Sequence, residues 1–242
     1  MTNVFCCQTI LDKFSTNLFN INIFLQARFL PALPRLPDDL VQILLDDFEF
    51  NRAKLKGSLD NCAKFKSFFL SSDPIVLEER RKHIPVNSVN QLGTLMTEIE
   101  NAYDKKLCDF NIIAVTSTTV IEWLRDHKLC DEATRPVVQE FVNGEFFPPH
   151  VDLHRANAIN YCFELGGQHV TTDFWQPRKE FAHLTVSPRT AFPYEKIELI
   201  DSFKAEIHQW FQLDTSVIHS VENMNLSERR IGLTMTTPKN LL

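Results

Sequence analysis

The second half of the sequence is divided into short segments in which apolar and polar residues alternate, and this pattern restricts the fold more than any other feature. It begins after about Thr134, and Gly, Pro, Asn and Asp residues separate the segments. Alternation with period two is typical of strands with one buried face. This many short strands predict an antiparallel sandwich or jelly roll. The candidate strands are Pro136–Val142, Pro149–Asp152, Ala156–Leu165, His169–Trp175, Phe181–Val186, Ile197–Phe203, Glu206–Leu213, Ser216–Val221 and Arg230–Thr236.

The first half of the sequence predicts helices instead. Apolar residues recur at helical spacing from Asp38 to Phe48, and again in one stripe over Val89–Ala102. A third helix is expected over Thr118–Lys128, after a strand at Phe110–Val115. Stripes of this kind bury one side of a helix against a neighbouring layer. We therefore expect these helices to pack against one face of the sandwich.

Together the two halves predict an α+β fold that is mainly β. Its core is a jelly roll, the double-stranded β-helix, over residues 136–237, and residues 1–135 form a helical N-terminal part packed on one sheet. No linker-like segment separates the two parts. We therefore expect residues 1–242 to form a single domain.

Composition restricts the partners and the compartment. The chain has 242 residues, 44% of them hydrophobic, and a formal net charge of −6. An acidic chain of this kind lacks the basic excess that supports binding to nucleic acid or to an anionic membrane. Residues 1–30 show no pattern of a signal peptide or a membrane span. The six cysteines form no C-x-x-C pair, so we expect free thiols and a cytoplasmic protein.

The first polar motif is His150-Val151-Asp152. Alternate residues of a strand share a face, so the imidazole and the carboxylate are expected to point the same way. Two such groups on a rigid strand can bind one metal ion from adjacent positions. A polar strand end without a metal is the alternative for this short motif.

A second polar residue, His219, interrupts an apolar strand pattern far along the chain. A buried histidine with a hydrogen-bond partner is one interpretation. The other is that a sandwich brings His219 against His150 and Asp152. Two histidines and one carboxylate leave coordination positions open, as in non-haem iron(II) oxygenases. A rival set from the remaining histidines shows no comparable pattern; these are His154, His169, His183 and His208.

The third feature is the last strand, which begins with Arg230. With period two, Arg230, Gly232 and Thr234 share one face, which we expect to line a cavity, and the apolar residues between them share the other. The planar guanidinium of Arg230 can bind a carboxylate through two hydrogen bonds. Arg229 is then expected at the surface.

The series His150-x-Asp152, His219 and Arg230 resembles the signature of the 2-oxoglutarate/iron(II) dioxygenase superfamily. The short sequences around these residues, Pro-Pro-His-Val-Asp and His-Ser-Val-Glu-Asn, resemble those of the prolyl and aspartyl/asparaginyl hydroxylase branch. The resemblance covers about residues 136–237. Many members have Ser or Thr two residues after the arginine, where this chain has Gly232. One oxoglutarate contact is therefore absent, or is replaced by Thr234 or a water.

The resemblance implies a hydroxylase that uses Fe(II) and 2-oxoglutarate as cofactor and co-substrate, O2 as oxidant, and a small-molecule or peptide substrate. His150, Asp152 and His219 would bind the iron and act in catalysis. Arg230 would bind the far carboxylate of 2-oxoglutarate, with Asn160 and Thr234 as further contacts. A cupin-like metalloenzyme without 2-oxoglutarate and a non-catalytic jelly-roll binding module are the alternatives.

Overall fold

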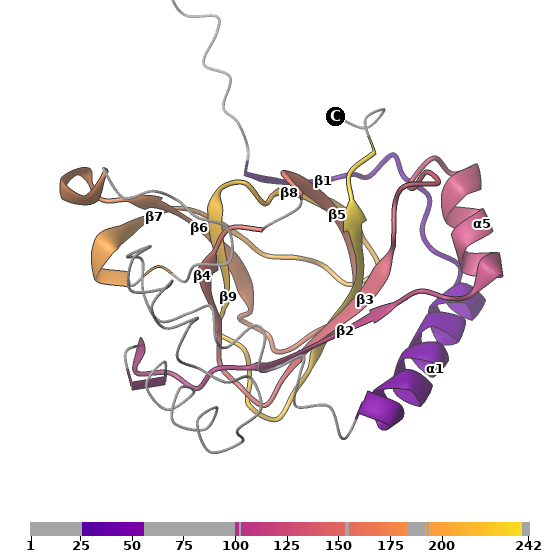
Figure 1. Ribbon diagram of the computed structural model, residues 1–242, viewed down its shortest axis with the longest axis horizontal. Coiled ribbons are helices and arrows are strands. Elements are labelled where there is room, and N and C mark those ends of the chain that lie inside the picture. Colours follow the sequence, from indigo (N-terminus) through magenta and orange to yellow (C-terminus); the bar gives the residue numbers. More distant parts are fainter. Residues whose placement is uncertain are drawn as a thin grey trace, which may run out of the picture.

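The computed structural model describes residues 26–55, 100–101, 103–152, 155–182, 192 and 194–238 (Figure 1). Most of the helix predicted at Val89–Ala102 lies outside these residues. His154 and His183 also lie outside them. The elements in chain order are β1 Ala27–Phe29, α1 Asp38–Leu55, β2 Asp109–Ala114, α5 Thr118–Asp126, β3 Val137–Val142, β4 Phe147–His150, β5 Asn157–Leu165, β6 Thr171–Pro177, η1 Lys179–Phe181, η2 Tyr194–Lys196, β7 Ile197–Phe203, β8 Trp210–Asp214, β9 Ile218–Glu222 and β10 Arg230–Thr236.

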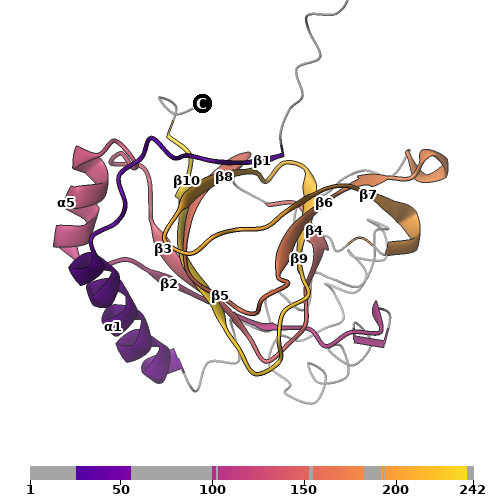
Figure 2. The ribbon, with the colours of Figure 1, turned by 180° about the vertical axis from the view of Figure 1, so that it is seen from behind.

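The strands form two antiparallel sheets that face each other as a β-sandwich (Figures 1 and 2). The six-stranded sheet has the order β1-β8-β5-β10-β3-β2, and the four-stranded sheet has the order β4-β9-β6-β7. From β3 onward the chain passes repeatedly from one sheet to the other, so strands distant in sequence become neighbours. The prediction of a mainly β sandwich is confirmed.

The N-terminal part contributes strands as well as helices. β1 pairs with β8 and β2 pairs with β3, so both lie at the edges of the six-stranded sheet. Helices α1 and α5 cover the outer face of this sheet (Figure 1). Their buried side chains, such as Phe48 and Leu124, share one apolar core with Ile231 and Leu233 of β10. The predicted packing of helices on one sheet is therefore confirmed for α1 and α5.

The predicted strand at Pro149–Asp152 is displaced in the structure. Strand β4 ends at His150, and its pairing with β9 is interrupted between Phe147 and His150. Two prolines occupy the intervening positions and have no N–H group to donate to the ladder. Asp152 lies beyond the strand, where its backbone N–H donates to the carbonyl oxygen of Thr215.

The strand predicted at Phe181–Val186 is also wrong where the structure describes it. Lys179–Phe181 forms a short 3-10 helix, and residues 183–186 lie outside the described residues. Helix α5 ends at Asp126 rather than at Lys128, whose φ of 58° lies in the left-handed region and cannot continue the helix.

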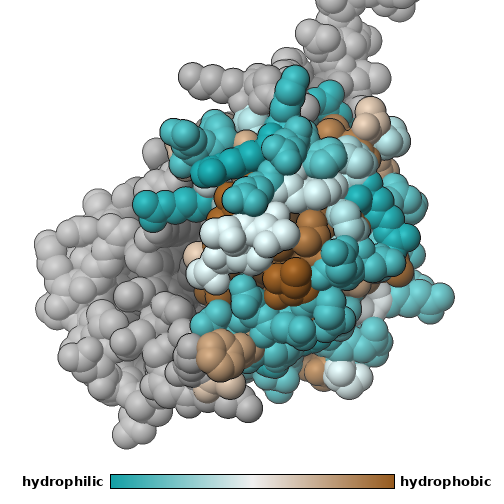
Figure 3. Space-filling view, turned by 90° about the vertical axis from the view of Figure 1, so that its right-hand side faces the viewer, coloured by the Kyte–Doolittle hydropathy of each residue, from teal (hydrophilic) through white to brown (hydrophobic). Residues whose placement is uncertain are grey.

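A network of charges joins α1 to the outer face of the six-stranded sheet. The Arg229 guanidinium donates to Glu164 at 2.7 Å and to Glu49 of α1, and it lies 3.7 Å from fully buried Glu140. Arg52 of α1 also pairs with Glu140, at 3.0 Å. The described surface on the side of α1 and α5 is mostly hydrophilic, with a limited hydrophobic patch (Figure 3). Neither described helix has the length and hydropathy to cross a membrane.

Candidate metal centre

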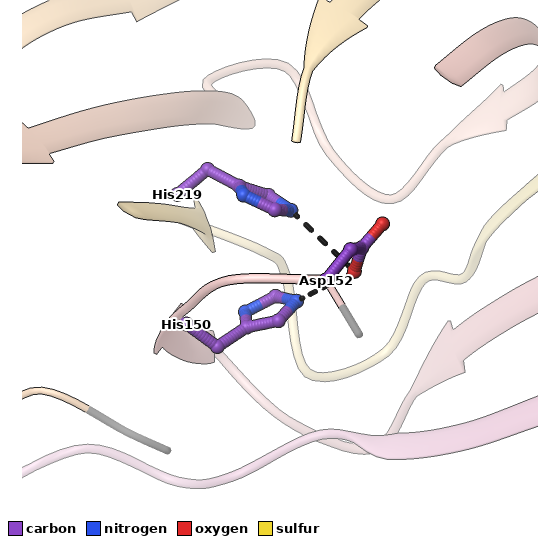
Figure 4. A group of neighbouring side chains, drawn as sticks. All are labelled: His150, Asp152 and His219. Atoms are coloured by element: carbon purple, nitrogen blue, oxygen red, sulfur yellow. Dashed lines mark ion pairs between the residues drawn. The ribbon is translucent and has the colours of Figure 1, made fainter. Parts of the chain in front are cut away.

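Two strands of the four-stranded sheet bring the predicted histidines together. His150 of β4 lies directly opposite His219 of β9, and their ring centroids are 4.4 Å apart. The carboxylate of Asp152 closes the group, with Oδ1 3.6 Å from His150 Nε2 and 4.0 Å from His219 Nε2 (Figure 4). One ligand atom from each residue lies within 4.8 Å of the others. The structure therefore gathers two imidazoles and one carboxylate at a single point, which we call the triad.

Backbone carbonyl groups orient both imidazoles. His150 Nδ1 lies 2.8 Å from the oxygen of Pro148, and His219 Nδ1 lies 2.9 Å from the oxygen of Val217. A proton on Nδ1 satisfies each of these hydrogen bonds and leaves Nε2 with its lone pair directed at the triad centre. This is the tautomer that a metal-binding histidine uses.

The electrostatic environment keeps the ligands in the form that binds metal. Burial, together with the neighbouring His150, lowers the pKa of His219 to about 4, so this imidazole is neutral at pH 7. Burial alone would raise the pKa of Asp152. The neighbouring His150 and the positive charge of Arg155 outweigh that effect and hold the pKa well below its usual range. Because metal ligands must be unprotonated, the donor set fits a divalent metal ion.

Arg155 fixes the carboxylate of Asp152 from the side opposite the histidines. Its Nε lies 2.5 Å from Asp152 Oδ2, and its Nη1 donates to Thr234 Oγ1 at 2.8 Å. The backbone oxygen of Arg155 accepts a hydrogen bond from Thr215. The sequence motifs did not predict this contact of Arg155. A cation three residues after the aspartate was the available signal.

The triad opens into a cavity of about 520 Å³ between the sheets, a size typical of small-ligand sites. Arg230 lines this cavity, is only 7% exposed, and donates from Nη2 to Thr172 Oγ1 at 3.2 Å. It forms no ion pair with any carboxylate among the described residues. Arg229 points to the opposite face of the sheet. The prediction that Arg230, and not Arg229, faces the cavity is confirmed.

The remaining predicted residues, Asn160 and Thr234, line the same cavity. Asn160 is buried there, and its side chain donates to the oxygen of Ala158 at 3.3 Å. The hydroxyl of Thr234 accepts the bond from Arg155. A Cβ atom at Gly232 would lie 2.7 Å from the carbonyl oxygen of Tyr161.

Comparisons with known proteins give remote structural similarity alone. No protein-family model matches the sequence, and no curated protein matches it. An oxalate oxidase in complex with glycolate is 14% identical over 53% of this chain and 51% of its own, with a TM-score of 0.29. The match thus spans about half of the length of that protein.

Two further solved structures show similarity at the same level. A 2OG-Fe(II) oxygenase family protein from Burkholderia pseudomallei is 9% identical over 59% of this chain and 77% of its own, with a TM-score of 0.33. A cupin superfamily protein from Desulfitobacterium hafniense is 7% identical over 53% and 77%, with a TM-score of 0.28. Similarity at this level assigns no function, so the functional argument depends on the residues of the cavity.

Proposed function

We propose that the protein is an iron(II)- and 2-oxoglutarate-dependent oxygenase that hydroxylates a C–H bond of an amino acid or peptide. The observation that carries this proposal is a buried, unpaired arginine in the same cavity as a His-Asp-His triad. A guanidinium that is almost fully buried with no carboxylate partner among the described residues is costly unless a ligand supplies an anion. The passage of the chain between the sheets from β3 to β10 also fits a double-stranded β-helix.

The relative position of the triad and Arg230 suits a short dicarboxylate. Arg230 contacts Thr172 of β6, and Phe174, two residues further along β6, lies opposite His219. At about 3.3 Å per residue, the anion site on β6 is about 7 Å from the level of the triad. 2-Oxoglutarate carries a chelating keto acid at one end and a carboxylate at the other. The first group fits the open side of a two-histidine, one-carboxylate metal site, and the second fits the fork of Arg230.

Bound together, Fe(II), 2-oxoglutarate and O2 supply the oxidation of C–H to C–OH, with succinate and CO2 as coproducts. The protein side chains bind and orient the reactants. Arg155 occupies Oδ2 of Asp152 and leaves Oδ1 directed at the histidines. Aromatic side chains on the cavity wall exclude water from the reaction; these are Phe110, Phe141, Phe147 and Phe211.

A ligand comparison in the absence of oxygen tests this assignment. Calorimetric titration of the iron(II)-loaded protein should show that 2-oxoglutarate binds more tightly than glutarate, which has both carboxylates but lacks the keto oxygen. Removal of iron, or the change His219→Ala, should abolish the difference while His169→Ala, at an exposed histidine, should preserve it. Equal affinity for the two acids would contradict the proposal.

The alternatives give distinct results in the same titration. A cupin-like metalloenzyme shares the sandwich and the triad, so it would bind iron without affinity for 2-oxoglutarate. A non-catalytic binding module would bind neither. Neither alternative accounts for the unpaired charge of Arg230.

A further inference from the structure

The cavity carries positive charge at two separate places along β10. Arg230 stands at the start of the strand and contacts Thr172. Arg155 contacts Thr234, four residues further along the same strand. At about 3.3 Å per residue, the backbone positions of Arg230 and Thr234 are about 13 Å apart along β10. The two arginines therefore reach the cavity at different levels of this strand.

A third arginine lies near the second place. Val137 of β3 pairs with Thr234, and Arg135, two residues before Val137, lines the same cavity. Residues two apart in an extended segment lie on the same side, so Arg135 is directed at the end of β10 that Arg155 contacts. Arg155 and Arg135 are here called the outer arginine pair.

The outer arginine pair is open to a ligand. Arg135 is exposed and makes no ion pair with any described residue. The side chain of Arg155 is 24% exposed. Its Nε and Nη1 are occupied, whereas its Nη2 has no hydrogen-bond partner among the described residues. Arg230 is thus the buried arginine of the cavity, and the outer arginine pair is its solvent-exposed counterpart.

The cavity has no comparable place for a positively charged group. Asp152 is the single carboxylate among the described lining residues, and Arg155 and the triad already occupy it. An ammonium group would therefore meet arginines without a compensating anion, and like charges at short range repel. Much of the remaining wall is apolar, as at Ile112, Val137 and Leu213.

We infer that the primary substrate carries a carboxylate that binds the outer arginine pair, an apolar body, and no free ammonium group. Within the proposed function, on which this inference rests, an N-acylated amino acid or the C-terminal residue of a peptide fits this description. A free amino acid does not.

Calorimetry on the protein loaded with iron(II) and 2-oxoglutarate, without oxygen, tests the inference. The probes are the N-acetyl derivatives of alanine, leucine and phenylalanine, each as the acid and as the amide, beside the unmodified amino acids. At least one N-acetyl acid should bind about tenfold more tightly than its amide and than the free amino acid, since hydrogen bonds to a charged group are strong. Equal binding of every acid and its amide, or no binding by any acid, would overturn the inference.

Two variants locate the site. Arg135→Gln should lower the affinity for the acid about fivefold, as expected for an exposed ion pair, and leave the affinity for the amide unchanged. Arg125→Gln, at an exposed position of α5 outside the cavity lining, is the control and should change neither. An equal loss for the acid and the amide in Arg135→Gln would also overturn the inference.

Titration with 2-oxoglutarate alone separates the two claims. If 2-oxoglutarate binds in an iron-dependent manner but acids and amides are not distinguished, the substrate inference fails and the proposed function stands. If 2-oxoglutarate does not bind, the proposed function itself fails.

Discussion

Arg229 and Arg230 are adjacent in the sequence, and their side chains lie on opposite faces of one sheet. Arg229 lies on the outer face, 27% exposed, where three glutamates surround it. Its hydrogen bond to Glu164, followed by that to Glu49, raises its pKa above the usual range. Arg230 is more deeply buried, yet it hydrogen-bonds a threonine hydroxyl and forms an ion pair with no described carboxylate.

The two arginines differ in whether carboxylates of the described residues neutralise their charge. Carboxylates of the protein neutralise Arg229, and the resulting network attaches α1 to the sheet. The described part of the protein supplies no anion for Arg230. A buried charge without a partner lowers stability, and the proposed function supplies the missing anion as a carboxylate of the co-substrate.

The largest expected effect separates the two arginines by ligand affinity. Arg230→Gln should weaken 2-oxoglutarate binding about 100-fold, because it removes a charged, two-bond contact in a buried site. Arg230→Lys should also weaken it, since a point charge does not replace the planar fork. Arg229→Gln is the matched control and should leave the affinity unchanged. The comparison breaks down if calorimetry shows similar losses for Arg229→Gln and Arg230→Gln.

For the free energy of unfolding, we expect the larger loss in Arg229→Gln and the smaller loss in Arg230→Gln. Arg229→Gln should lower the free energy of unfolding by about 2 kcal/mol, because Glu140 and its neighbours lose part of their counter-charge. Arg230→Gln should cost less, or stabilise the ligand-free protein, because no protein carboxylate loses a partner. Urea unfolding without added ligand measures both. A larger loss for Arg230→Gln than for Arg229→Gln would contradict this assignment of roles.

Gly232 lies two residues after Arg230 on the same face of β10, so it tests how tightly the cavity face of this strand is packed. A Cβ atom there would meet the carbonyl oxygen of Tyr161 at 2.7 Å, a backbone atom that cannot move aside cheaply. Gly232→Ala and Gly232→Ser should therefore each lower the free energy of unfolding by about 1.5 kcal/mol. Gly232→Ser should also fail to tighten 2-oxoglutarate binding. A serine variant of normal stability and higher affinity would show that the strand adjusts.

The smallest effect concerns pH and the cavity histidine. His219 has a pKa of about 4 in the folded protein against 6.5 in the unfolded chain, so the unfolded chain takes up a proton first as the pH falls. The free energy of unfolding of the metal-free protein should drop by about 1 kcal/mol from pH 7 to pH 5.5 through this group. His219→Gln should remove that part of the dependence, and exposed His169→Gln should keep it. An unchanged pH profile in His219→Gln would contradict the lowered pKa.

The sequence predicted what depends on periodicity. Alternation located β10 residue for residue and placed Arg230 on the cavity face. The triad was also predicted, because residues at a fixed spacing in a known order form a recognisable motif. The bounds of β4 were wrong, since the prolines interrupt the ladder where polarity alone suggested a strand.

Contacts between distant segments were not readable from the sequence. The bond of Arg155 to Thr234, for example, joins residues 79 positions apart and depends on the approach of β10. Strand β1 was missed because it is three residues long and lies at an edge of the sheet.

Conversion of 2-oxoglutarate to succinate tests the central claim most directly. Protein loaded with iron(II) without oxygen is mixed with 2-oxoglutarate, and succinate is measured after oxygen is admitted. We expect slow succinate formation even without a primary substrate, abolished by His219→Ala, strongly reduced by Arg230→Gln and retained by Arg229→Gln. Absence of succinate from the iron-loaded protein, or equal formation by His219→Ala, would contradict the assignment of the triad and Arg230 to this reaction.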